Sequence, residues 1–175
     1  ESVEAYRDAG APNGPMAGVY LFSVARASQA LHGCRRVVDL GCGPARFLAQ
    51  VALLNPEIEF LGVDLSDAML ASAAEHLTAL GIKNVKLQKG DATELTFLES
   101  KSFDGVMSTL ALHHLPTMKH LRLCFQEVDR ILVDDGALYL FDLGRPKSLK
   151  TILAMAYIHE ERQAHAFSVD SERSW

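Results

Sequence analysis

"VVDLGCGPARF" (residues 37–47) joins a short apolar run to a glycine turn and then to a segment with helical apolar spacing. Gly41 and Gly43 allow positive φ and let a ligand approach the main chain closely. A dinucleotide-binding loop carries a third glycine, and this chain has Arg46 where that glycine would stand. The stretch therefore predicts a strand, a ligand-binding turn and a helix, and it leaves the kind of ligand open.

The same order of strand and helix continues along the chain. Helical apolar spacing runs over residues 15–31, 44–55, 66–80 and 116–132. Apolar runs predict strands at residues 35–40, 58–64 and 84–92, within 103–115, and at 137–143. This alternation predicts parallel strands joined by right-handed crossovers. We therefore expect an α/β fold, a doubly wound and mostly parallel Rossmann-like sheet with helices on both faces.

Several residues mark where these elements should begin and end. Pro44 falls in the first turn of the second helix, where its missing N–H costs nothing. Ser66 is the expected N-cap of the third helix, and Gly81 follows its last turn. A turn at 134–136 should precede the fifth strand. The expected apolar stripe of the fourth helix runs through Leu121, Phe125, Val128 and either Ile131 or Leu132.

Composition and charge narrow the function classes. The chain has 175 residues, 49% hydrophobic and 22% charged, which is typical of one globular domain with a real core. The net charge is −5 without a Lys/Arg stripe, so we expect no direct nucleic-acid partner. No apolar run could span a bilayer and no signal segment is recognised, so we expect a cytoplasmic protein. Cys34, Cys42 and Cys124 contain no Cys-x-x-Cys pair, which fits a reducing compartment and predicts no metal site.

Aspartates stand at the ends of two predicted strands, where an open parallel sheet binds its ligands. Asp64 comes 23 residues after Gly41, and a carboxylate there can accept both hydroxyl hydrogens of a ribose. The alternative role of Asp64 as an N-cap is weakened by Ser66, which already fills that place. Asp91 could accept from the amino group of an adenine, or it could form an Asx-turn.

Four stretches, in this order, resemble the successive motifs of class I S-adenosylmethionine-dependent methyltransferases: VVDLGCGPARF (37–47), FLGVDLS (60–66), LQKGDATEL (87–95) and FDGVMSTLALHHL (103–115). The resemblance is closest to small-molecule methyltransferases with His-His-Leu after the fourth strand. It implies S-adenosylmethionine as cofactor and S-adenosylhomocysteine as product. It also implies a methyltransferase core over 15–146, between an irregular arm (1–14) and a C-terminal helix with an unassigned tail (147–175).

The resemblance places the methionine part of the cofactor over the glycine turn. Gly41 and Gly43 would pass beneath it. Asp39 would hold its amino group directly or through water, and Ser108 would approach it through the backbone. Ala45 stands where the family usually has a third small residue, often glycine.

The adenosine part is assigned in the same way. Asp64 would take the ribose diol, with Leu65 packing near the adenine. Asp91 would meet the adenine amino group, aided by the N–H of Ala92. Met69 would flank the adenosine, or else it faces the helix core.

Methyl transfer is an in-line displacement, so the enzyme must chiefly align and desolvate the nucleophile. A base is needed only when the acceptor keeps its proton at neutral pH. We expect His113, ahead of His114, to be such a base. Alternatively, the pair caps the turn before Pro116 and packs against the cofactor loop. Asp142, at the end of the fifth strand, either lines the acceptor pocket or caps the next turn.

The acceptor is expected to be an unidentified small molecule, methylated on O, N, S or C. The Asn-Pro-Pro-Tyr or Asp-Pro-Pro-Tyr stretch of many nucleic-acid amino-group methyltransferases is replaced by STLA (108–111). Tyr6 or Tyr20 could form an aromatic lid. The final strands of the family are incomplete, because AHAFSV (164–169) is the only candidate. Either the chain is truncated, or pieces are missing, or a second copy in a homodimer covers the sheet edge.

Two other functions remain open. The glycine loop and Asp64 would also suit an NAD-dependent oxidoreductase, but Arg46 and the stretches after the third and fourth strands argue against it. A catalytically silent S-adenosylmethionine-binding module that acts through a partner protein would keep the same loops.

Overall fold

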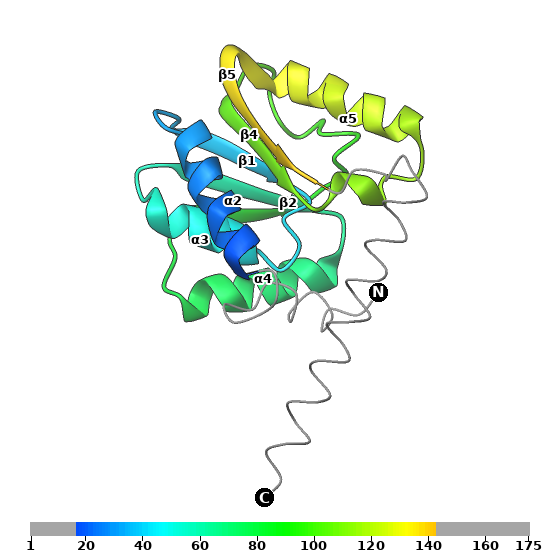
Figure 1. The fold of residues 1–175 in the computed structure, drawn as a ribbon. Coiled ribbons are helices and arrows are strands. Elements are labelled where there is room, and N and C mark those ends of the chain that lie inside the picture. Colours follow the sequence, from blue (N-terminus) through cyan, green and yellow to red (C-terminus); the bar gives the residue numbers. More distant parts are fainter. Residues whose placement is uncertain (1–16, 143–175) are drawn as a thin grey trace, which may run out of the picture. The chain divides into compact units, whose positions relative to one another are not determined.

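The computed structural model describes residues 17–142, whose five strands pair in the order β3-β2-β1-β4-β5 (Figure 1). Every neighbouring pair is parallel. The strands are β1 (Arg36–Leu40), β2 (Glu59–Asp64), β3 (Val85–Lys89), β4 (Phe103–Thr109) and β5 (Leu132–Phe141). Strand order reverses between β1 and β4, which is where sheets of this kind bind ligands. The doubly wound parallel sheet expected from the sequence is confirmed.

Helices cover both faces of this sheet (Figure 1). One face carries α2 (Ala17–Ala30), α3 (Arg46–Leu54) and α4 (Asp67–Ala79), and the other carries α5 (Met118–Ile131). Successive strand residues point to opposite faces, so Val37 packs with the first three helices and Val38 with α5. Both valines are fully buried, which explains why β1 reads as one continuous apolar run.

The start and end expected for α4 are confirmed. The Ser66 hydroxyl accepts a hydrogen bond from the N–H of Met69 at 3.3 Å, as an N-cap does. Gly81 follows the helix with a φ of 67°, a conformation that costs glycine little. These two signals set the position of the helix that follows the end of β2.

The start expected for α3 is wrong. The helix begins at Arg46, and its N-cap is Ala45 in the left-handed region (φ 56°, ψ 25°). Pro44 therefore lies before the cap instead of in the first turn. The N–H of Ala45 donates to the carbonyl of Cys42 at 2.9 Å, so the glycine turn extends to residue 45 before helical geometry can begin.

The turn expected at 134–136 is also wrong. β5 begins directly after α5, with Leu132 paired to Phe103, and the register then shifts so that Gly105 pairs with Ala137. The three residues thus lie in an irregular part of the strand. Leu132 packs against the core beneath α5. As a result, β5 begins earlier than the sequence suggests.

The expected stripe of α5 is correct only in part. Val128 and Ile131 are buried, but the third buried residue is Cys124, and Phe125 is 38% exposed. Adjacent helix positions differ by about 100° in direction. The sheet beneath the helix decides which of the two faces inward.

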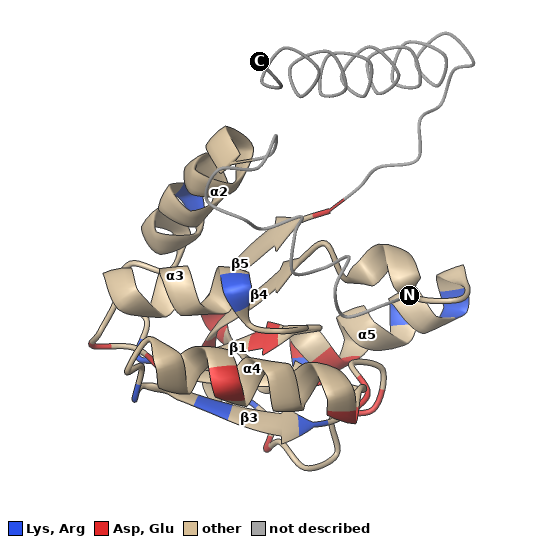
Figure 2. Cartoon of the chain, turned by 90° about the horizontal axis from the view of Figure 1, so that it is seen from below, with Lys and Arg blue, Asp and Glu red and all other residues tan. Residues whose placement is uncertain are grey.

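Some expectations lie outside the described residues: the arm with Tyr6, the C-terminal helix and the candidate strand at 164–169. The domain boundaries and the homodimer stay predictions. In residues 17–142 no helix has the length and apolar character needed to cross a membrane. Over the same residues, Lys and Arg are interspersed with Asp and Glu instead of forming one basic stripe (Figure 2).

Candidate active site

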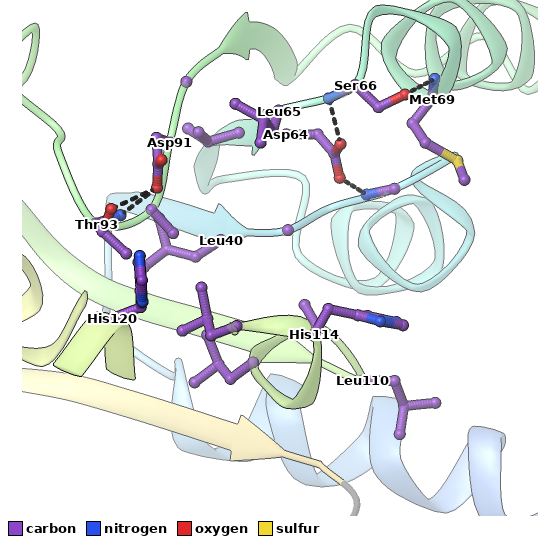
Figure 3. Close-up of a pocket in the computed structure, with 18 of the residues that line it drawn as sticks. Leu40, Asp64, Leu65, Ser66, Met69, Asp91, Thr93, Leu110, His114 and His120 are labelled. Atoms are coloured by element: carbon purple, nitrogen blue, oxygen red, sulfur yellow. Dashed lines mark hydrogen bonds between the residues drawn. The ribbon is translucent and has the colours of Figure 1, made fainter. Parts of the chain in front are cut away.

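A cavity of about 580 Å³ lies at the carboxyl ends of the strands (Figure 3). Its wall includes the last residues of β1 and β2 and the residues that follow β3 and β4. The structure brings to this wall seven of the residues that the resemblance assigns to the cofactor: Gly41, Gly43, Asp64, Leu65, Met69, Asp91 and Ala92. These residues lie at or after the ends of β1, β2 and β3, and they meet because these strands are parallel neighbours.

The glycine turn is held close to β2 and to the turn after β4. The N–H groups of Gly41 and Cys42 both donate to the carbonyl of Val63, at 2.8 and 3.0 Å. Gly41 and Gly43 have φ values of 74° and 53°. A Cβ added at Gly41 would collide with the Cβ of Ala111, whereas one added at Gly43 would meet nothing within 4 Å. Gly41 is therefore required both for its conformation and for close packing.

The Asp64 carboxylate ties this turn to the start of α4. Its Oδ2 accepts from the N–H of Gly43 at 2.8 Å, and its Oδ1 accepts from the N–H of Ser66 at 2.9 Å. A carboxylate has about four lone-pair positions, so each oxygen can accept one more hydrogen bond. Asp64 thus has a structural role beside any role toward a ligand.

Asp91 has one engaged oxygen. Its Oδ1 accepts from both the N–H and the hydroxyl of Thr93, at 2.8 and 2.7 Å, which is the Asx-turn arrangement. Within the described part of the chain, its Oδ2 has no partner. The side chain lines the cavity, so this second oxygen can serve a ligand while the first holds the loop.

Asp39 and Ser108 lie beneath the cavity wall and are each 2% exposed. The Ser108 hydroxyl donates to the carbonyl of Leu40 at 2.7 Å, which fastens β4 to β1. Asp39 Oδ1 has no hydrogen-bond partner within the described residues. Burial above all, and then the charge of Asp64, raise the pKa of Asp39 to about 8. A buried carboxyl in this state favours either a proton or a nearby cation.

The two histidines after β4 differ in their surroundings. His114 lines the cavity, and His113 does not. The Nδ1 of His113 lies 2.6 Å from Oδ1 of Asp142, and the two imidazole centroids are 4.0 Å apart. Asp142 is likewise absent from the wall and binds the turn formed by Leu112–His114. The role of His113 as a base stays a prediction.

Sequence reasoning missed part of the cavity wall. Leu110, Ala111, Leu115, Pro116, Thr93 and His120 also line it. In Figure 3, His120 lies toward the end with Asp91 and Thr93, and His114 and Leu110 lie toward the other end. All of these residues follow the ends of β3 or β4, and that position was the available signal.

Two other side chains occupy packed positions. Tyr20 lies edge-on against Phe47 with ring centroids 5.4 Å apart, and burial raises its pKa. It does not line the cavity, so its contacts are those of a core residue and not of a lid. Burial is also the main cause of the raised pKa of Cys42, which fits a loop filler better than a reactive thiol.

A family model described as a methyltransferase domain matches residues 31–172. The chain belongs to this family. The resemblance to class I S-adenosylmethionine-dependent methyltransferases, based on the four motifs, is thereby confirmed. This methyltransferase domain has the glycine turn and the strand-end aspartates at the cavity where the family motifs converge.

Similar proteins are longer than this methyltransferase chain. A tRNA (guanine-N(7)-)-methyltransferase of Geobacillus kaustophilus is 33% identical over 112 residues, covering 59% of this chain and 50% of the relative. A malonyl-[acyl-carrier protein] O-methyltransferase of Legionella pneumophila is 32% identical over 131 residues, covering 75% and 43%. The solved YcgJ protein of Bacillus subtilis has a TM-score of 0.63 at 29% identity, covering 73% and 53%. The chain spans about half the length of the curated relatives it matches.

Proposed function

We propose that this cavity binds S-adenosylmethionine and that the protein transfers the methyl group to a small-molecule acceptor. The observation that carries the proposal is the convergence of the Gly41–Gly43 turn, Asp64 and Asp91 on one cavity. The family to which the chain belongs depends on this cofactor. A volume of about 580 Å³ is also typical of a small-molecule or cofactor site.

The buried polar groups near the glycine turn fit the methionine part of the cofactor. Asp39 Oδ1 is buried without a partner among residues 17–142, and a cationic amino group nearby would compensate its charge. Gly41 and Gly43 would leave space for the chain of the methionine. Ser108 would act through its backbone, since its hydroxyl is already engaged with Leu40.

The rest of the cavity wall fits an adenosine. Asp64 would accept the two ribose hydroxyls with the lone pairs that Gly43 and Ser66 leave available. Asp91 Oδ2 and the N–H of Ala92 would pair with the adenine edge. The apolar side chains of Leu65 and Met69 would cover the base, and Leu65 is 64% exposed and so is accessible to it.

When bound, S-adenosylmethionine supplies an electrophilic methyl group on a sulfonium sulfur. The contribution of this chain is to hold the acceptor in line and to exclude water from it. If the acceptor keeps its proton at neutral pH, His113 would accept that proton, and His114 would contact the acceptor at the cavity wall.

The acceptor class is the least constrained part of the proposal. One relative is named for a tRNA guanine and another for malonyl-[acyl-carrier protein]. The net charge of −5 and the interspersed charges of the described elements favour a small molecule over a nucleic-acid backbone (Figure 2). We also propose a cytoplasmic location, in keeping with the cysteine pattern.

Ligand-dependent melting tests the cofactor. We expect S-adenosylhomocysteine at a hundred times its dissociation constant to stabilise the protein by about 2.7 kcal/mol, and Asp64→Ala to abolish the shift. Asp67→Ala is the matched control, because Asp67 is exposed in the first turn of α4 and pairs with Lys89 at 2.5 Å instead of lining the cavity. A rise in melting temperature with NADH, and none with S-adenosylhomocysteine, would support the oxidoreductase and contradict the proposal.

Transfer of a labelled methyl group tests the activity. Labelled S-adenosylmethionine is offered separately to fractionated metabolites, to RNA and to protein. Label in a metabolite fraction is the expected result. Label only in RNA or protein would contradict a small-molecule acceptor, and cofactor binding without any transfer would favour the silent binding module.

A further inference from the structure

The turn after β4 is held by the end of β5. Leu110, the first residue after β4, has a φ of 52°, which is rare for a bulky side chain. Its N–H donates to the carbonyl of Phe141 at 2.8 Å. A strained residue of this kind persists only where its surroundings over-determine it. Asp142, which follows the last residue of β5, also contacts this turn.

Asp142 receives three hydrogen bonds from the same turn. Its Oδ2 lies 2.8 Å from the N–H of Leu112 and 3.2 Å from the N–H of His113. Its Oδ1 lies 2.6 Å from Nδ1 of His113. One carboxylate therefore orients both the backbone of the turn and the imidazole ring.

This contact decides which ring nitrogen of His113 carries the proton. A carboxylate can only accept hydrogen bonds, so the short contact to Oδ1 requires a proton on Nδ1. The neutral ring then has its lone pair on Nε2. The His113 side chain is 29% exposed, and its ring lies against that of His114 in the cavity wall. The His113 ring thus lies next to the cavity wall, in contact with the His114 ring that forms part of it.

We propose that Asp142 is a positioning residue that holds His113 in the Nδ1–H tautomer and presents Nε2 as the proton acceptor for the methyl acceptor. The inference rests on the proposed function, since it gives this ring a part in methyl transfer. In the step, the O–H or N–H bond of the acceptor breaks and its proton bonds to Nε2. The electron pair stays on the acceptor atom, and Asp142 neutralises the resulting imidazolium.

Nitrogen NMR of the histidine rings tests the tautomer without any acceptor. In alkaline buffer, ¹⁵N-labelled wild-type protein should show a protonated Nδ1 and an unprotonated Nε2 for His113, with the signals assigned through His113→Gln. In Asp142→Asn, the amide oxygen is expected to accept the two backbone N–H groups and the NH₂ to face Nδ1. The ring proton should therefore move to Nε2.

Asp135→Asn is the matched control, because Asp135 is exposed on β5, the strand that leads to Asp142, and does not lie in the turn. It should leave the tautomer of His113 as in the wild type. A wild-type ring with its proton on Nε2, or the same tautomer in Asp142→Asn, would overturn the proposal. If Asp142→Asn does not fold, the wild-type spectrum alone tests which tautomer His113 adopts.

Measurements of turnover distinguish a positioning role of Asp142 from a general contribution to the stability of the fold. With an acceptor fraction from the labelling experiment, Asp142→Asn should lower turnover about 10²- to 10⁴-fold, the usual range for a general base. Its dissociation constant for S-adenosylhomocysteine should stay within about twofold of the wild type. Unchanged turnover would contradict the role of Asp142. Absence of transfer by the wild type would instead count against the proposed function, while the NMR result still tests Asp142.

Discussion

The carboxylate of Asp64 and the N–H of Gly43 lie 2.8 Å apart, and this bond joins the end of β2 to the turn after β1. The same carboxylate binds the N–H of Ser66 at the start of α4. One side chain thus orients the glycine turn and the helix that flank the cavity. Stability and ligand binding should therefore respond together when Asp64 changes.

Asp64→Asn should weaken both properties. The amide keeps the shape of the side chain but loses the charge and one acceptor, and a hydrogen bond to a charged group contributes about 1.5–3 kcal/mol. We expect the free energy of unfolding to fall by an amount in this range and the dissociation constant of S-adenosylhomocysteine to rise at least tenfold. Urea unfolding and calorimetry measure the two. If Asp64→Asn binds S-adenosylhomocysteine as tightly as Asp67→Asn does, Asp64 is not part of the binding site.

Gly41→Ala should destabilise the protein more than Gly43→Ala. Both substitutions place a Cβ at positive φ, which costs about 1–2 kcal/mol. Only at Gly41 does the new Cβ collide with Ala111, which should add about 1–3 kcal/mol of overpacking. The urea midpoints of the two variants make the comparison, and equal midpoints would show that the turn after β4 does not press on Gly41.

Asp39 should make stability depend on pH. Its pKa is raised from 3.8 to about 8, chiefly by burial, so the folded state binds the proton more tightly than the unfolded chain. The stabilisation is full below about pH 4 and is lost as the pH rises toward 8, by at most about 1.4 kcal/mol per pH unit. Asp39→Asn should remove this slope.

Unfolding of wild type and Asp39→Asn by urea at several pH values between 5 and 8 isolates the contribution of Asp39, because other groups cancel in the difference. We expect the variant to gain stability relative to the wild type as the pH rises. The exposed Asp67→Asn should show no such trend. A pH-independent difference between wild type and Asp39→Asn would mean that Asp39 ionises as freely in the folded protein as in the unfolded chain.

Substitution of the two histidines should separate binding from turnover. His114→Ala removes part of the cavity wall, and a loss of about 1 kcal/mol, roughly fivefold in affinity for S-adenosylhomocysteine, is expected. His113→Gln should leave this affinity within about twofold and reduce methyl transfer. Calorimetry and the labelling assay measure the two effects. The opposite pattern would assign the base to His114.

Much of the sheet could be predicted because its signals are local. Val37 and Val38 are buried on opposite faces, and their strand therefore shows as an unbroken apolar run. Ser66 and Gly81 mark the ends of α4 by their own capping chemistry. Pro44 misled the prediction because the turn before it continues to Ala45 through a hydrogen bond to Cys42.

The candidate site was predictable where each residue follows a strand end. Gly41, Asp64 and Asp91 needed only the parallel order of the strands to be brought together. Asp142 was noticed at its strand end, but its bonds to Leu112 and His113 link residues about thirty positions apart, and no local pattern records them.

The sequence by itself determined the parallel sheet, the glycine turn and the family, because alternating periodicity and short motifs carry that information within a few residues. Only the tertiary structure decided that His114 faces the cavity while His113 faces Asp142, and that Oδ1 of Asp39 is buried without a hydrogen-bond partner among the described residues. Side-chain direction and desolvation depend on neighbours from distant strands. Those neighbours are set by the packing of the whole sheet and not by the sequence nearby.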